Sequence, residues 1–173
     1  MRRDAQRILL IGMMGSGKTT IGRALGSRLD RPFFDNDQLV RGLTGREPAE
    51  IDATDGEEAL HDAEIAAFHA AVREPGAAVI AVAGAIVDVP AERDRLRDAG
   101  FVVWLRARPE TLRARIGSGA GRRDDATDVA WIARRAAERE PAYAGVADVT
   151  VDVDSAGPEE AVAQILSALD GED

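Results

Sequence analysis

The sequence has 173 residues, 45% of them apolar, and a formal net charge of −9 at pH 7, which suits one globular domain with a substantial core. The acidic balance argues against a general nucleic-acid-binding protein, because phosphate recognition usually needs a basic face. The absence of cysteine excludes disulfides and fits a reducing compartment, and no apolar stretch approaches the ~20 residues of a membrane helix. We therefore expect a cytoplasmic protein, monomeric or weakly dimeric, that binds neither nucleic acid nor membrane.

The first part of the chain carries a phosphate-binding motif in its expected context. An apolar run from Arg7 to Ile11 predicts a buried strand, and the spacing of apolar residues between Lys18 and Leu29 predicts a helix. Between them stands Gly12-Met13-Met14-Gly15-Ser16-Gly17-Lys18-Thr19, the eight-residue pattern of a P-loop. A strand, a glycine loop and a helix in this order are what the motif requires.

The rest of the chain continues this alternation. The strand runs are mostly continuous rather than alternating, which indicates a largely parallel sheet covered on both faces. A small, glycine-rich and charged stretch at about 117–126 is typical of a mobile lid. Further strands are predicted at 32–35, 77–82, 101–105 and 148–153, and helical segments at 38–73, 90–99, 109–116, 127–140 and 158–169.

These elements predict an α/β fold of the P-loop NTPase or NMP-kinase type. We expect a five-stranded, mostly parallel sheet flanked by helices, in a single domain over residues 1–173. Within it, the stretch at 117–126 would form the lid.

The chemistry of the loop points to a nucleoside triphosphate. Glycines allow successive backbone N–H groups to face one phosphate, and the helix that follows adds its positive dipole end. Lys18 is the only lysine beside 21 arginines, and it stands where a compact ammonium must sit among phosphates. The alternative is an ordinary glycine-rich turn. The residues expected to hold ATP are Gly12, Met14, Gly15, Ser16, Gly17, Lys18, Thr19 and Thr20, with Thr19 also a Mg²⁺ ligand.

Among P-loop proteins, a compact kinase fits best. A GTPase would normally carry an Asn-Lys-x-Asp motif, but the one asparagine, Asn36, and the one lysine, Lys18, lie far apart. A large ATPase motor would need a longer chain.

Several ordered pieces make the chain resemble the shikimate kinase family from Ile8 to Leu169. They are Ile11 to Gly22, Phe34-Asp35-Asn36-Asp37, Ala53-Thr54-Asp55-Gly56-Glu57 with Glu64, and Arg139-Glu140-Pro141-Ala142-Tyr143. The resemblance implies ATP-dependent phosphoryl transfer, with Mg²⁺, to a hydroxyl of a small molecule. It also implies that the helical residues of about 36–73 form a substrate-binding region.

The resemblance also implies roles for individual residues. Asp35 would help to hold Mg²⁺ through water, and Asp37 would bind the acceptor hydroxyls and act as catalytic base beside Lys18. Arg139 would clamp an acceptor carboxylate, and Arg122 or Arg123 would close over ATP. The alternatives are helix capping for the two aspartates, a solvated helix surface for Arg139 and a solvated loop for the lid arginines.

Two departures from the family pattern fall in the expected acceptor site. His61 stands where the family has a second clamping arginine, and an imidazole is largely uncharged at pH 7. Losing one charge-assisted contact costs about 1.5–3 kcal/mol. The family's Gly-Gly-Gly turn reads Ala83-Gly84-Ala85, which keeps only the central glycine for the acceptor.

These observations leave three functional hypotheses open. The first is a shikimate kinase, or a kinase of that type acting on a related cyclic polyol or acid. The second is a catalytically silent ATP-binding regulatory module, and the third is a kinase for a different small alcohol. Retention of Lys18, Thr19, Asp35 and Asp37 speaks against the silent module.

Overall fold

The computed structural model describes residues 7–116 and 128–171. The predicted lid at 117–126, with Arg122 and Arg123, lies outside this part. The strands are β1 (Arg7–Ile11), β2 (Phe33–Asp35), β3 (Ala78–Ala81), β4 (Phe101–Arg106) and β5 (Val149–Asp152). They form one sheet in the order β2-β3-β1-β4-β5, and every neighbouring pair is parallel. The predicted α/β class and all five strands are thus confirmed.

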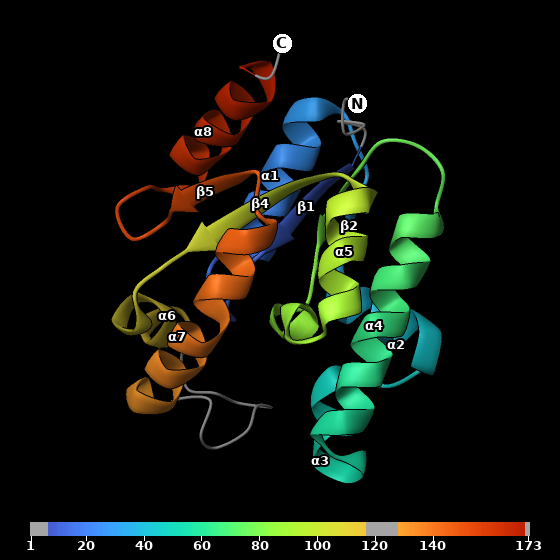
Figure 1. The fold of residues 1–173 in the computed structure, drawn as a ribbon. Coiled ribbons are helices and arrows are strands. Elements are labelled where there is room, and N and C mark those ends of the chain that lie inside the picture. Colours follow the sequence, from blue (N-terminus) through green and yellow to red (C-terminus); the bar gives the residue numbers. More distant parts are fainter. Residues whose placement is uncertain (1–6, 117–127, 172–173) are drawn as a thin grey trace.

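The helices surround this sheet and connect its strands. They are α1 (Lys18–Leu29), α2 (Asn36–Thr44), α3 (Pro48–Asp55), α4 (Glu57–Arg73), α5 (Pro90–Ala99), α6 (Pro109–Ile116), α7 (Val129–Val146) and α8 (Pro158–Asp170), and a 3-10 turn, η1 (Gly84–Asp88), follows β3. Figure 1 shows α5 and α7 in front of the sheet and α1 behind it, which gives three layers.

The two faces of the sheet bury different sets of helices. Because successive strand residues point to opposite faces, Leu9 and Ile11 of β1 lie in one core cluster with residues of α4, α5 and α7. Ile8 and Leu10 lie in the second cluster, with residues of α1 and α8. The side chains of these four β1 residues are fully buried, as expected for a continuous apolar run in the centre of a parallel sheet.

Two details of the helices differ from the sequence-based prediction. The helical stretch predicted at 127–140 continues through Pro141 to Val146, because Tyr143 and Val146 on its last turns are buried in the core and this packing outweighs the proline's missing N–H. The turn η1 was not predicted, and it places Gly84 and Asp88 at its two ends.

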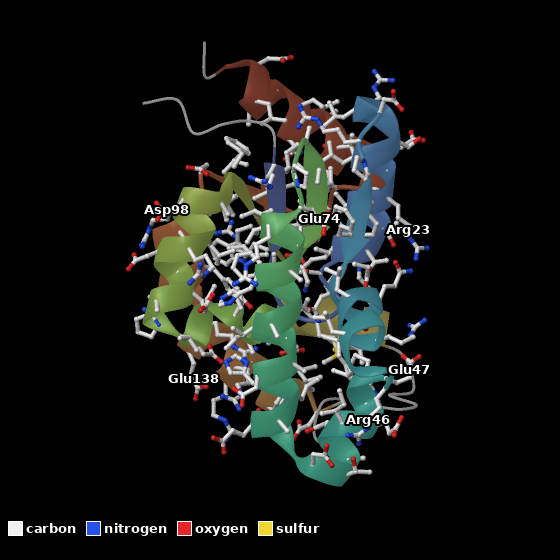
Figure 2. All side chains as sticks on the ribbon, turned by 90° about the vertical axis from the view of Figure 1, so that its right-hand side faces the viewer. Arg23, Arg46, Glu47, Glu74, Asp98 and Glu138 are labelled. Carbon is white, nitrogen blue, oxygen red and sulfur yellow. The ribbon has the colours of Figure 1, made fainter. Side chains whose placement is uncertain are left out.

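The helical region predicted at about 36–73 consists of α2, α3 and α4. These helices have a small core of their own around Val40, Ile51 and Ala67. At the outer end of this region, Nη1 of Arg46 lies 2.5 Å from Oδ2 of Asp55 and joins the segment before α3 to the last residue of α3. Figure 2 shows Arg46 and Glu47 at this end of the molecule, far from Glu74 at the opposite end of α4. In the described residues, no helix is long and apolar enough to cross a membrane.

Candidate active site

Three loops that carry the predicted site residues leave neighbouring strands at one edge of the sheet. The P-loop follows β1, Asp35 ends β2, and the turn Ala83-Gly84-Ala85 follows β3. Since β2, β3 and β1 are adjacent and parallel, their carboxyl ends meet, which is where open α/β sheets bind ligands. The strand order therefore assembles one site from segments that are distant in the sequence.

The P-loop glycines stand at positions where a side chain would clash with neighbouring backbone atoms. Gly12 has a φ of +144°, and a Cβ there would lie 2.6 Å from the carbonyl oxygen of Leu105. Gly15 has a φ of +84°, and its Cβ would lie 2.8 Å from the carbonyl oxygen of Leu112. Ser16 is fully buried, and its Oγ has no hydrogen-bond partner among the described residues. The loop is a tight backbone cradle with an unsatisfied polar atom, as a phosphate-binding loop requires.

Lys18 is held by the loop itself. Its Nζ donates to the carbonyl oxygens of Gly12 at 2.7 Å and Met13 at 3.0 Å. Burial lowers the pKa of Lys18 to about 8, although the nearby carboxylates of Asp37 and Glu64 favour the charged form. Within residues 7–116 and 128–171, no carboxylate forms an ion pair with this ammonium, so its charge can be offered to a phosphate.

Asp35 performs two structural tasks. Its Oδ2 accepts a 2.6 Å hydrogen bond from Oγ1 of Thr19, and its Oδ1 accepts one of 3.0 Å from the backbone N–H of Asp37. The second bond caps the N-terminus of α2, so the capping alternative for Asp35 is confirmed. Asp37 itself is exposed, on the first turn of α2, and lies within electrostatic range of Lys18.

Arg139 reaches the turn after β3 from α7. Its Nε and Nη2 donate to Oδ1 and Oδ2 of Asp88 at 3.0 and 2.8 Å, while Nη1 lies 3.7 Å from Sδ of Met13. A Cβ built on Gly84 would lie 3.8 Å from this same Nη1. Only 12% of the Arg139 side chain is exposed, so the solvated-surface alternative for Arg139 is wrong.

His61 and Glu64 form the α4 side of the site. Nδ1 of His61 lies 3.8 Å from Oε2 of Glu64 and is buried without a hydrogen-bond partner among the described residues. Burial, together with the negative charge of Asp37, raises the pKa of Glu64 to about 7, although Arg139 and Lys18 act in the opposite direction. His61 is therefore not an exposed surface histidine, and its ring carries an unused polar atom.

The structure adds two residues to those predicted. Tyr143, buried next to Trp104, donates a 2.8 Å hydrogen bond from its hydroxyl to the carbonyl oxygen of Gly84. Asp88 pairs with Arg139 from the far end of η1. Tyr143 stood in the Arg-x-Pro-x-Tyr motif without an assigned role, and nothing in the sequence pattern singled out Asp88. Of the other predicted ATP-binding residues, Gly17 caps α1, Met14 is half-buried and Thr20 is exposed.

A glycine cradle with a half-buried lysine, beside two aspartates and an arginine on a parallel α/β sheet, defines the class of P-loop small-molecule kinases. The family model described as shikimate kinase matches residues 14–170. The chain therefore belongs to the shikimate kinase family. It is a kinase that phosphorylates an alcohol group, with ATP as the donor that this family uses.

Relatives and solved structures agree with this assignment. The chain is 43% identical over 169 residues to "Shikimate kinase" of Symbiobacterium thermophilum, which covers 94% of this chain and 95% of that protein. It is 39% identical to "Shikimate kinase" of Moorella thermoacetica, over 94% of this chain and 93% of that one. The fold matches a shikimate kinase from Acinetobacter baumannii in complex with shikimate, with a TM-score of 0.90 and 25% identity over 99% of this chain and 96% of that one.

Proposed function

We propose that this protein transfers the γ-phosphoryl group of MgATP to a ring hydroxyl of shikimate. Lys18, Asp37 and Arg139 come from three separate parts of the chain, and the observation that carries the proposal is that both Asp37 and Arg139 lie within electrostatic range of Lys18. They bring a phosphate-binding cation, a candidate base and a carboxylate-binding guanidinium together in one site.

The phosphate end of the site fits MgATP. The backbone of the loop and Lys18 would hold the β- and γ-phosphates, since the ammonium is anchored on loop carbonyls and has no ion-pair partner in the part of the chain that the structure describes. Thr19 and Asp35 would hold Mg²⁺, directly or through water, because their oxygens already lie 2.6 Å apart at the end of the loop. When bound, the ion supplies positive charge that neutralises the phosphate oxygens.

The acceptor hydroxyl would be activated by Asp37. Its exposed carboxylate can accept the proton as the acceptor oxygen forms its bond to the γ-phosphorus and the bond to the β-phosphate oxygen breaks, releasing ADP. Phosphoryl transfer depends mainly on positioning and charge neutralisation. Lys18 and Asp37 therefore have the roles of charge stabilisation and orientation of the nucleophile.

The carboxylate of the acceptor would bind between α7 and α4. Arg139 offers Nη1 near Gly84, and His61 offers a buried Nδ1 that makes no hydrogen bond to any described residue. A protonated imidazole donates a charge-assisted hydrogen bond, so His61 can contribute part of what a second arginine would give. We infer that shikimate is accepted, with a weaker carboxylate clamp than two arginines would make.

A coupled assay of ADP release tests the proposal. Shikimate, a neutral cyclitol and a non-cyclic small alcohol are each offered with MgATP, and Lys18→Met is the negative control. We expect turnover with shikimate well above that with the other two acceptors. ATP binding without acceptor-dependent ADP release would instead support the silent regulatory module, and a preference for the cyclitol or the small alcohol would reassign the acceptor.

We further expect the enzyme to be cytoplasmic and monomeric or weakly dimeric. Light scattering after size exclusion, with and without nucleotide, measures the oligomeric state.

A further inference from the structure

Asp88 occupies two of the three nitrogens of the Arg139 guanidinium. Oδ1 accepts from Nε at 3.0 Å and Oδ2 accepts from Nη2 at 2.8 Å, so the two planar groups face each other through two nearly parallel hydrogen bonds. This bidentate arrangement fixes orientation as well as distance. The Arg139 side chain is mostly buried, whereas 39% of the Asp88 side chain remains exposed.

The pairing leaves one edge of Arg139 for the acceptor. Nη1 lies between the P-loop and the turn after β3. It is 3.7 Å from Sδ of Met13 and 3.8 Å from the position of a Cβ on Gly84. A thioether is a weak hydrogen-bond acceptor, so this nitrogen keeps nearly its full donor capacity. Asp88 therefore determines which guanidinium nitrogen faces the acceptor pocket.

Asp88 and Arg139 belong to η1 and α7, and a second hydrogen bond also joins these two elements. Asp88 is the last residue of η1 and Gly84 is the first, while Arg139 and Tyr143 stand one turn apart on α7. Tyr143 bonds to Gly84 and Arg139 bonds to Asp88, so α7 holds η1 at both ends. These contacts fix the position of Arg139 relative to the turn after β3.

We propose that Asp88 is a positioning residue for acceptor recognition: it holds Arg139 so that a single guanidinium nitrogen, Nη1, binds the acceptor carboxylate. This inference rests on the proposed function, because it takes the acceptor to be a carboxylic acid. It makes Asp88 part of the specificity apparatus without contact with the acceptor.

Two opposing effects decide what removal of the Asp88 charge does. Neutralising Asp88 removes a negative charge near the pocket, but that charge is partly exposed and therefore screened by solvent. A released arginine side chain regains rotamer entropy, which the acceptor would then have to offset on binding. Loss of orientation therefore outweighs loss of repulsion, and acceptor binding should weaken.

Asp88→Asn tests this with little change in volume. We expect KM for shikimate to rise about fivefold to twentyfold, while kcat and KM for ATP change less than threefold. Asp94→Asn is the matched control, because Asp94 also pairs with an arginine, Arg97, but on the exposed surface of α5. Asp88→Glu keeps the charge and should recover part of the effect.

A second measurement does not depend on the acceptor. The Nε–H resonance of Arg139, identified by its loss in Arg139→Lys, should exchange slowly in the wild-type protein and rapidly in Asp88→Asn. An unchanged resonance, an unchanged or lower KM for shikimate, or a parallel loss of kcat, ATP affinity and stability would each overturn the inference. If the resonance responds but the wild-type enzyme does not use shikimate, the proposed function fails and the positioning of Arg139 by Asp88 stands.

Discussion

The hydroxyl of Tyr143 lies 2.8 Å from the carbonyl oxygen of Gly84 and donates a hydrogen bond to it. Gly84 is also close to the P-loop, since a Cβ on it would lie 3.0 Å from the carbonyl oxygen of Gly12. The turn after β3 is thus packed between the phosphate-binding loop and α7. Small displacements of this turn should therefore alter both the P-loop and the position of Arg139 on α7.

Tyr143→Phe should loosen this turn without leaving a cavity. The ring stays stacked near Trp104, but the Gly84 oxygen loses its donor, which costs about 1 kcal/mol of unfolding free energy. Urea denaturation measures this loss, and KM for the acceptor should rise while KM for ATP stays within twofold. Equal increases in both KM values would contradict an effect confined to the turn after β3.

Gly84→Ala should impair catalysis more strongly. The added methyl group would lie 3.0 Å from the Gly12 oxygen and 3.3 Å from the Tyr143 hydroxyl, so either the turn or the P-loop must shift. A displacement of the reacting groups by a fraction of an ångström should lower kcat by about tenfold or more. Gly42→Ala, where a Cβ meets nothing within 4 Å, is the control and should keep its activity.

Glu64→Gln should change the pH dependence of stability. Because the folded-state pKa of Glu64 is raised from 4.5 to about 7, the folded protein binds more protons than the unfolded chain between these values. Wild-type stability therefore falls as pH rises from about 4.5 to about 7. The glutamine variant lacks this loss and should be more stable than wild type at pH 8 by up to about 3 kcal/mol.

Thermal or urea unfolding at pH 5 and pH 8 measures this difference. Glu58→Gln, at an exposed position of the same helix, should leave the wild-type pH profile in place. A Glu64→Gln profile parallel to that of the wild type would show that Glu64 is not the group responsible.

His61→Arg should strengthen acceptor binding if the acceptor is a carboxylate. A permanently charged guanidinium beside the pocket adds a charge-assisted contact of about 1.5–3 kcal/mol, which corresponds to roughly a tenfold to hundredfold lower KM for shikimate. KM for a neutral cyclitol should not fall. Asp62→Asn, an exposed neighbour on α4, changes the net charge by the same amount and should not reproduce the effect.

Local sequence patterns were sufficient to predict the strands, the approximate position of most helices and the proposed phosphate site. The P-loop is one continuous segment, so its spacing alone specifies the cradle around Lys18. Continuous apolar runs predicted most of the strands, because burial on both faces leaves a local signature, and alternation predicted β5, of which one face is exposed. The helix that contains Pro141 extended further than predicted, because its continuation depends on the burial of Tyr143 and Val146 in the tertiary core.

The acceptor side depends on contacts between distant segments. Asp88 and Arg139 are 51 residues apart, and Tyr143 and Gly84 are 59 apart, so no local spacing reveals either pair. The sequence by itself determined the proposed phosphate site, because its backbone N–H groups and one lysine lie within a single loop. Only the tertiary structure decided the orientation of Arg139, the proposed acceptor clamp, because that orientation depends on the packing of α7 against the turn after β3.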